Sequence, residues 1–141
     1  MKSDVILNKA STIERCLRRI NEEYEHNPKN LENFTKQDAI LLNIQRACEA
    51  SIDIAMHMVA QNKLGIPQNS RDAFEFLAKN NYITEEVSFM MKSMVGFRNI
   101  AVHDYQDINL EIVQAIIEKH LSDFKLYVKQ ALQVNSDINQ K

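Results

Sequence analysis

Hydrophobic residues recur every three to four positions over most of this chain, which is the spacing of α-helices that bury one face. Five such stretches follow one another, at about residues 4–26, 35–62, 70–80, 84–103 and 107–134. Polar residues suited to capping precede them, among them Ser3 or Asp4, Thr35 with Asp38 in a near capping box, Thr84, and Asp107 or Asn109. The pattern predicts an all-α fold, a compact bundle of about five helices.

The second stretch differs from the others because its apolar residues fall on two stripes. One stripe includes Ile44 and Ile54, and the other includes Cys48 and Ala55. A helix that is apolar on two sides is buried on two sides. We therefore expect this helix to pack on its own core and on a second surface, which favours pairing of two copies of the chain.

Composition limits the class of protein. The 141 residues are 45% hydrophobic and 26% charged, with two Gly and two Pro, which is typical of one soluble globular domain. We expect residues 1–134 to form this domain and residues 135–141 to form a polar tail. A net charge of −2 argues against a protein that coats nucleic acid non-specifically.

No signal peptide or membrane-spanning run is present, so we expect a cytoplasmic protein without a membrane partner. Cys16 and Cys48 are isolated and are expected to be buried thiols, and no metal or cofactor is expected.

The candidate chemistry lies in residues 97–105, near the end of the fourth stretch. Arg98 carries a planar fork of donors that matches phosphate oxygens, and His103 can exchange a proton near neutral pH. Asn99 can orient the imidazole or donate to phosphate. On these residue types we predict metal-independent cleavage of RNA, in which His103 activates the ribose 2′-hydroxyl and Arg98 stabilises the charge on phosphate. The plainer alternative is an Arg and a His that complement the end of a helix.

Helix geometry complicates this site. Arg98 and His103 are five residues apart, which is about 140° around an ideal helix, so the two side chains diverge. They approach each other only if the helix loosens after Val102. Two copies facing each other across a two-fold axis would instead bring two arginines and two histidines into one groove. We therefore predict a two-fold homodimer.

Two other clusters of charged residues each have two interpretations. Glu49 and Asp53 lie on a polar stripe of the second helix with Arg46 beside them, either as a structural ion-pair network or as the lining of the active groove. Arg15, Arg18 and Arg19 form a basic cluster on the first helix. This cluster is either an ordinary solvated face or a track for RNA.

The segment Arg98-Asn99-x3-His103-x-Tyr105 resembles the Arg-x4-6-His signature of the HEPN superfamily, in the form found in HepT-like toxins. Residues 45–55 and 94–99 resemble the same family, and the resemblance covers roughly residues 5–130. Asp104 departs from the neutral or apolar residue at this place in many members. Its carboxylate is expected to change the basicity of the imidazole or to repel RNA.

The resemblance implies a homodimeric, metal-independent ribonuclease toxin that acts on RNA such as tRNA or mRNA. It also implies a minimal nucleotidyltransferase antitoxin, which transfers AMP from ATP to Tyr105. An adenylyl group there would add bulk and negative charge beside Arg98 and His103 and so exclude RNA. The alternative function is a non-catalytic helical module that docks such a nucleotidyltransferase and is modified by it.

Overall fold

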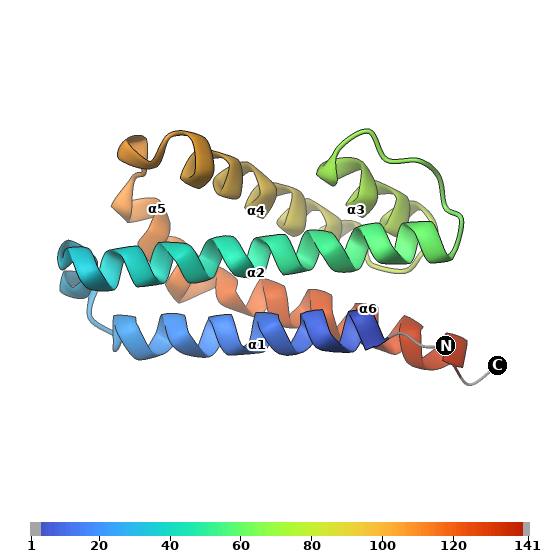
Figure 1. Cartoon of the computed structure of the whole chain (residues 1–141), viewed down its shortest axis with the longest axis horizontal. Coiled ribbons are helices and arrows are strands. Elements are labelled where there is room, and N and C mark those ends of the chain that lie inside the picture. Colours follow the sequence, from blue (N-terminus) through green and yellow to red (C-terminus); the bar gives the residue numbers. More distant parts are fainter. Residues whose placement is uncertain (1–3, 140–141) are drawn as a thin grey trace.

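Four long helices form the body of the protein, and successive members run in opposite directions (Figure 1). They are α1 (Asp4–Tyr24), α2 (Phe34–Gln61), α4 (Glu85–His103) and α6 (Leu121–Asn139). Each packs on the next, and α6 returns to α1, which closes the bundle. The computed structural model describes residues 4–139, and it describes side-chain burial as far as Val134. Within this range every regular element is helical, which confirms the predicted all-α bundle.

Shorter helices complete the connections. The helix α3 (Ser70–Lys79) packs on α2 and α4, and α5 (Leu110–Ala115) follows α4. The last predicted helix is divided, because a π-helical segment, Ile116–His120, joins α5 to α6. A π segment inserts one extra residue and shifts the buried face. Ile116 and Ile117, three and four residues after the buried Val113, are both buried.

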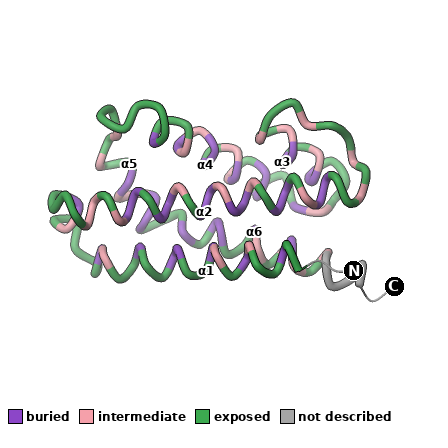
Figure 2. Tube along the Cα trace, viewed as in Figure 1, coloured by how far each residue is buried: buried purple, intermediate pink, exposed green. Residues whose placement is uncertain are grey.

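The helix α2 is buried on two sides within a single chain (Figure 2). It packs against α1 on one side and against α3 and α4 on the other. Both predicted stripes are used in this way, since Ile44, Ile54, Cys48 and Ala55 are all buried. The second apolar stripe therefore faces this chain's own helices, and the interpretation that it favours a dimer was wrong.

The caps of the helices agree with the sequence at two of the four predicted starts, and Ser3, one candidate at the first start, lies outside the described residues. Thr84 accepts a hydrogen bond from the backbone N–H of Val87 at the start of α4, and Asn109 caps α5. The start of α2 differs, because the Asn33 side chain caps it and the helix begins at Phe34. Asp38 therefore does not serve in a capping box with Thr35, and its carboxylate is available for another contact.

The core is built around aromatic rings from α3 and α6. Phe74 meets Tyr127 edge to face, with ring centroids 5.5 Å apart, and the Tyr127 hydroxyl donates to the backbone carbonyl of Ser51 at 2.8 Å. Cys16 and Cys48 are buried free thiols, as predicted.

Within the described range no helix is both long and apolar enough to cross a membrane. Of the predicted tail, residues 135–139 continue α6, and residues 140–141 lie outside the described residues.

Candidate active site

Arg98 lies on the inward face of α4, at the boundary between the core and solvent. Its Nη2 donates to Glu49 Oε2 on α2 at 3.4 Å, and its Nη1 donates to the side-chain oxygen of Asn99 at 3.1 Å. Its Nε is buried without a hydrogen-bond partner among the described residues. These two contacts hold the guanidinium in place. Because a guanidinium carries five N–H donors, some donors remain for an anion. Asn99 thus contacts Arg98 within this chain.

His103 is the last residue of α4 and is exposed. The helix stays regular up to this point, because the backbone N–H of Asp104 donates to the carbonyl of Ile100 at 2.8 Å. The loosening after Val102 that would return the imidazole toward Arg98 is absent. His103 and Arg98 therefore keep their helical divergence of about 140°, and one chain does not bring them together.

Asp104 ends α4 and redirects the chain. Its backbone angles, φ −135° and ψ 51°, leave the helical region, and its carbonyl accepts from the N–H of Asp107 at 2.9 Å. The resulting 3₁₀ turn, Tyr105–Asp107, brings the phenol of Tyr105 back to the start of α2. The carboxylate of Asp104 is exposed and has no ion-pair partner among the described side chains.

At the start of α2 the Tyr105 hydroxyl donates to the carboxylate of Asp38. Partial burial, together with this hydrogen bond and the negative charge of Asp38, raises the pKa of Tyr105 to about 12. Asp38 was not predicted as a site residue, because its position three residues after Thr35 suggested a capping box. Helical spacing carried a signal, since Asp38 precedes Gln45 by seven residues and extends the polar stripe backwards along α2.

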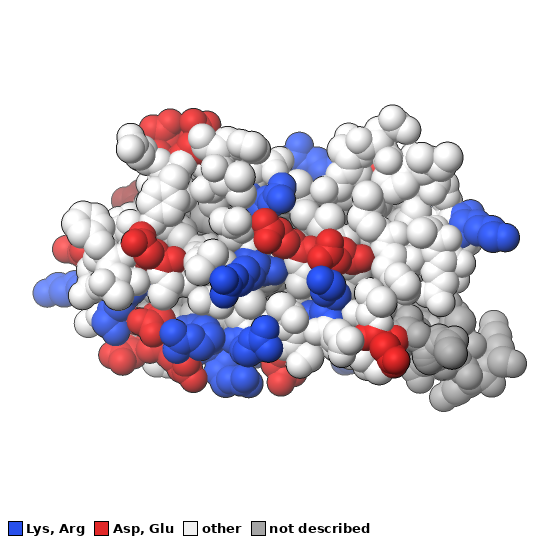
Figure 3. Space-filling view, in the orientation of Figure 1, with Lys and Arg blue, Asp and Glu red and all other residues white. Residues whose placement is uncertain are grey.

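The polar stripe of α2 is an ion-pair network with partners from other helices. Gln45 donates to Glu49 at 3.2 Å, and Glu49 pairs with Arg98. Asp53 pairs with Lys9 of α1 at 3.0 Å. Arg46 is exposed and is not the cation that separates the two carboxylates. Figure 3 shows basic side chains on both sides of acidic ones over the middle of α2, a mixed surface and not a uniformly positive one.

The basic cluster of α1 lies on an exposed face, where Figure 3 shows blue side chains gathered along this helix. Arg19 pairs with Glu22 at 2.8 Å and with Glu23 at 3.3 Å. These pairs neutralise part of the cluster. Arg15 and Arg18 are exposed beside them.

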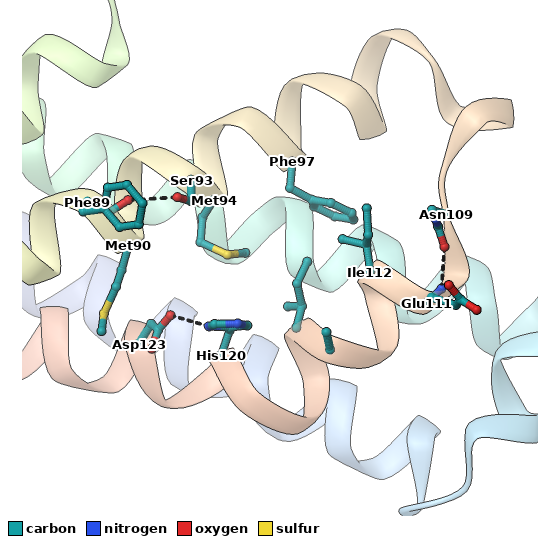
Figure 4. A pocket seen from close by; sticks show the side chains of 12 residues that line it. Phe89, Met90, Ser93, Met94, Phe97, Asn109, Glu111, Ile112, His120 and Asp123 are labelled. Atoms are coloured by element: carbon teal, nitrogen blue, oxygen red, sulfur yellow. Dashed lines mark hydrogen bonds and ion pairs between the residues drawn. The ribbon is translucent and has the colours of Figure 1, made fainter.

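Two hollows adjoin α4. One, of about 390 Å³, lies between α4 and the α5–α6 region, and its walls are mostly apolar (Figure 4). It contains a pair between His120 and Asp123 at 2.9 Å, but none of the predicted site residues. The other, of about 420 Å³, is lined by Tyr105 and residues of α2 that include Asp38 and Gln45. Among the described residues no group of three His, Cys, Asp or Glu side chains is arranged to hold a metal.

A helical bundle that carries this motif at the end of α4 resembles a HEPN-type protein. Comparison with known proteins agrees. The sequence model described as "Ribonuclease HepT-like" matches residues 13–131. An mRNA nuclease HepT of Shewanella oneidensis is 52% identical over 126 residues, which are 89% of this chain and 95% of that protein. A tRNA nuclease HepT of Aphanizomenon flos-aquae is 32% identical over 100 residues, 71% of this chain and 68% of that protein.

Solved structures are similar over nearly the whole chain. A crystal structure of a toxin–antitoxin with AMP-PNP has a TM-score of 0.87 and 50% identity, over 92% of this chain and 98% of that one. A tri-AMPylated Shewanella oneidensis HEPN toxin in complex with MNT antitoxin has a TM-score of 0.87 and 49% identity, over 94% and 98%. This chain belongs to the HepT-like ribonuclease family of the HEPN superfamily.

Proposed function

We propose that this protein is a metal-independent endoribonuclease toxin of the cytoplasm, carried by one domain that spans residues 1–134, and that a cognate minimal nucleotidyltransferase silences it. The observation that carries the proposal is Arg98. Its guanidinium is held between α2 and α4 by Glu49 and Asn99, with donors left for phosphate oxygens. An exposed histidine follows five residues later on the same helix. The names of the two HepT relatives support RNA as the substrate, mRNA in one and tRNA in the other.

The chemistry requires the ribose 2′-hydroxyl. His103 takes the proton from this hydroxyl as its oxygen attacks phosphorus, and Arg98 stabilises the charge that develops on the phosphoryl oxygens. The bond to the 5′-oxygen breaks, and a second imidazole returns a proton to that oxygen. The products are a 2′,3′-cyclic phosphate and a 5′-hydroxyl end. DNA has no 2′-hydroxyl and is therefore spared.

A homodimer supplies the second imidazole. In one chain Arg98 and His103 diverge, because α4 stays regular through His103. Exposed apolar side chains, Phe89 and Ile100, lie on the outward side of α4, the side that also carries His103. Unpaired apolar surface of this kind is typical of an interface. We propose that two copies pair around a two-fold axis beside the ends of their α4 helices, so that His103 of one chain reaches the solvent-facing donors of Arg98 of the other.

Tyr105 is the proposed point of control. The related Shewanella oneidensis toxin is tri-AMPylated in its complex with MNT antitoxin. In this chain Tyr105 lies two residues after His103, with 43% of its surface exposed, so an enzyme can reach it. An added AMP would place a phosphodiester charge and a nucleoside beside the catalytic groove and repel RNA.

The test is incubation of the purified protein with total RNA and with tRNA in EDTA. Wild type should cleave, and His103→Ala should lose about 10³-fold or more in rate, because the proton-transfer group is removed. His57→Ala is the matched control, since His57 lies on α2 away from the motif and should leave cleavage unchanged. Intact mass must first show that the preparation carries no AMP. Equal cleavage by His103→Ala and wild type would refute the catalytic assignment, and no cleavage by unmodified wild type would favour the scaffold function.

A further inference from the structure

The contact between Tyr105 and Asp38 is unusual among the tyrosines of this chain. Two described tyrosines donate to a carboxylate, Tyr24 to Glu118 and Tyr105 to Asp38. Tyr24 is 3% exposed, so its contact belongs to the core. Tyr105 lines the 420 Å³ hollow and is 43% exposed. A phenol that is both accessible and paired with a carboxylate is placed for reaction as a nucleophile.

Resting on the proposed function, we propose that Asp38 is the base that accepts the phenolic proton of Tyr105 when this residue is adenylylated. The toxin thus supplies one catalytic group for its own silencing. The nucleotidyltransferase would bind the nucleoside triphosphate and its metal ion, and the substrate chain would bring the nucleophile and the base already in contact.

The reaction balances as a transfer of AMP from ATP. A lone pair of Tyr105 Oη forms a bond to the α-phosphorus, and the bond from that phosphorus to the bridging oxygen breaks. Pyrophosphate leaves with this electron pair. The phenolic proton passes to the Asp38 carboxylate, which later releases it to water. Because the O–H already points at Asp38, the lone pairs of the same oxygen remain free to face the nucleotide.

A local base matters because this phenol does not ionise readily. Burial and the contact with Asp38 hold the pKa of Tyr105 at about 12, so almost no phenolate exists at neutral pH. A carboxylate that takes the proton during attack removes this barrier, as an aspartate does for the substrate hydroxyl in protein kinases.

The test compares rates of AMP transfer to full-length wild type, Asp38→Asn and Asp38→Ala by the cognate nucleotidyltransferase with ATP and Mg²⁺, followed by intact mass. Asp38→Asn preserves the shape and an acceptor oxygen but removes the basicity. We expect transfer at pH 7 to fall about 100-fold in both variants. The rate for Asp38→Asn should then rise about tenfold per pH unit, because reaction depends on free phenolate, whereas the wild-type rate should be nearly flat. Asp107→Asn, an equal charge change two residues from Tyr105, is the control and should react as wild type does.

The outcomes separate the two proposals. If wild type gains AMP on Tyr105 and Asp38→Asn reacts at the same rate, Asp38 is not the base. A slow Asp38→Asn variant with a flat pH profile also overturns the proposal, because it indicates loss of positioning alone. If wild type gains no AMP, or Tyr105→Phe gains as much as wild type, the proposed control of Tyr105 itself is wrong.

Discussion

The two ends of the motif differ in how the fold holds them. Arg98 faces inward from α4, bonds to Glu49 of α2, and has a buried Nε. His103 and Tyr105 lie on the exposed corner where α4 ends, which is green in Figure 2. The proposed anion-binding group is therefore fixed by the bundle, whereas the proposed proton-transfer and modified groups are on the surface. Under the proposed function, the bundle prepares half of the site and other molecules complete it.

The largest expected effect comes from an experiment that mixes two inactive variants and tests whether Arg98 and His103 act from opposite chains. Arg98→Ala and His103→Ala should each lose cleavage, whereas a mixture allowed to exchange subunits should regain part of it, with water in place of the second imidazole as proton donor. Random pairing makes about half of the dimers mixed, and each mixed dimer retains one Arg98 and one His103 on opposite chains. Cleavage of tRNA before and after exchange gives the measurement. Failure to recover activity, with exchange verified by mass, would mean either that both groups act from the same chain or that cleavage requires both imidazoles.

The buried interior that holds the inward side of α4 predicts large effects on stability when it is altered. Phe74→Ala should lower the free energy of unfolding by about 3–5 kcal/mol, since it removes a buried ring that packs on Tyr127. Phe34→Ala is the control, because Phe34 is 77% exposed and should change stability by about 0.5 kcal/mol or less. Urea unfolding of wild type, Phe74→Ala and Phe34→Ala measures both changes in the free energy of unfolding. A small effect of Phe74→Ala would mean that the packing of α3 on α6 contributes little.

Alkaline titration should separate a core tyrosine from a surface one. Burial and then the Glu118 contact raise the pKa of Tyr24 from 10.0 to about 12. A raised folded-state pKa stabilises the fold below the unfolded value, and this contribution is lost as pH rises from about 10 to 12. Tyr24→Phe should reduce that alkaline loss, measured by urea unfolding at pH 9–12. Tyr105→Phe should reduce it less, because its phenol is exposed. The reverse order would contradict the assignment of Tyr24 to the core.

The smallest expected effect concerns the partner of Arg98. Glu49→Gln removes a negative charge beside the anion-binding group, so the KM for RNA should fall. An ion pair this exposed contributes about 0.2–1 kcal/mol, or up to about fivefold. Glu75→Gln, which breaks the Lys92 pair on α3, should leave KM unchanged. A rise in KM for Glu49→Gln would show that Glu49 is needed to position Arg98 more than it competes with phosphate.

The sequence predicted the regular parts of the fold well, because helical periodicity and caps act locally. The buried face of α1 and the cap at Thr84 follow from residues a few positions apart. The π-helical segment at Ile116–His120 escaped prediction, because its extra residue depends on how α5 and α6 pack. The cap of α2 was also misplaced, since Asn33 and Thr35 are equally suitable in sequence.

The sequence by itself determined that the chain is helical, that it carries the Arg98–His103–Tyr105 motif, and which family it belongs to. These properties depend on residue types and short spacings. Only the tertiary structure decided that Glu49 contacts Arg98, that both stripes of α2 face this chain's own helices, and that Asp38 receives the Tyr105 hydroxyl. Asp38 and Tyr105 are 67 positions apart. A contact across that separation depends on how α4 crosses α2 and where Asp104 turns the chain, which no local pattern encodes.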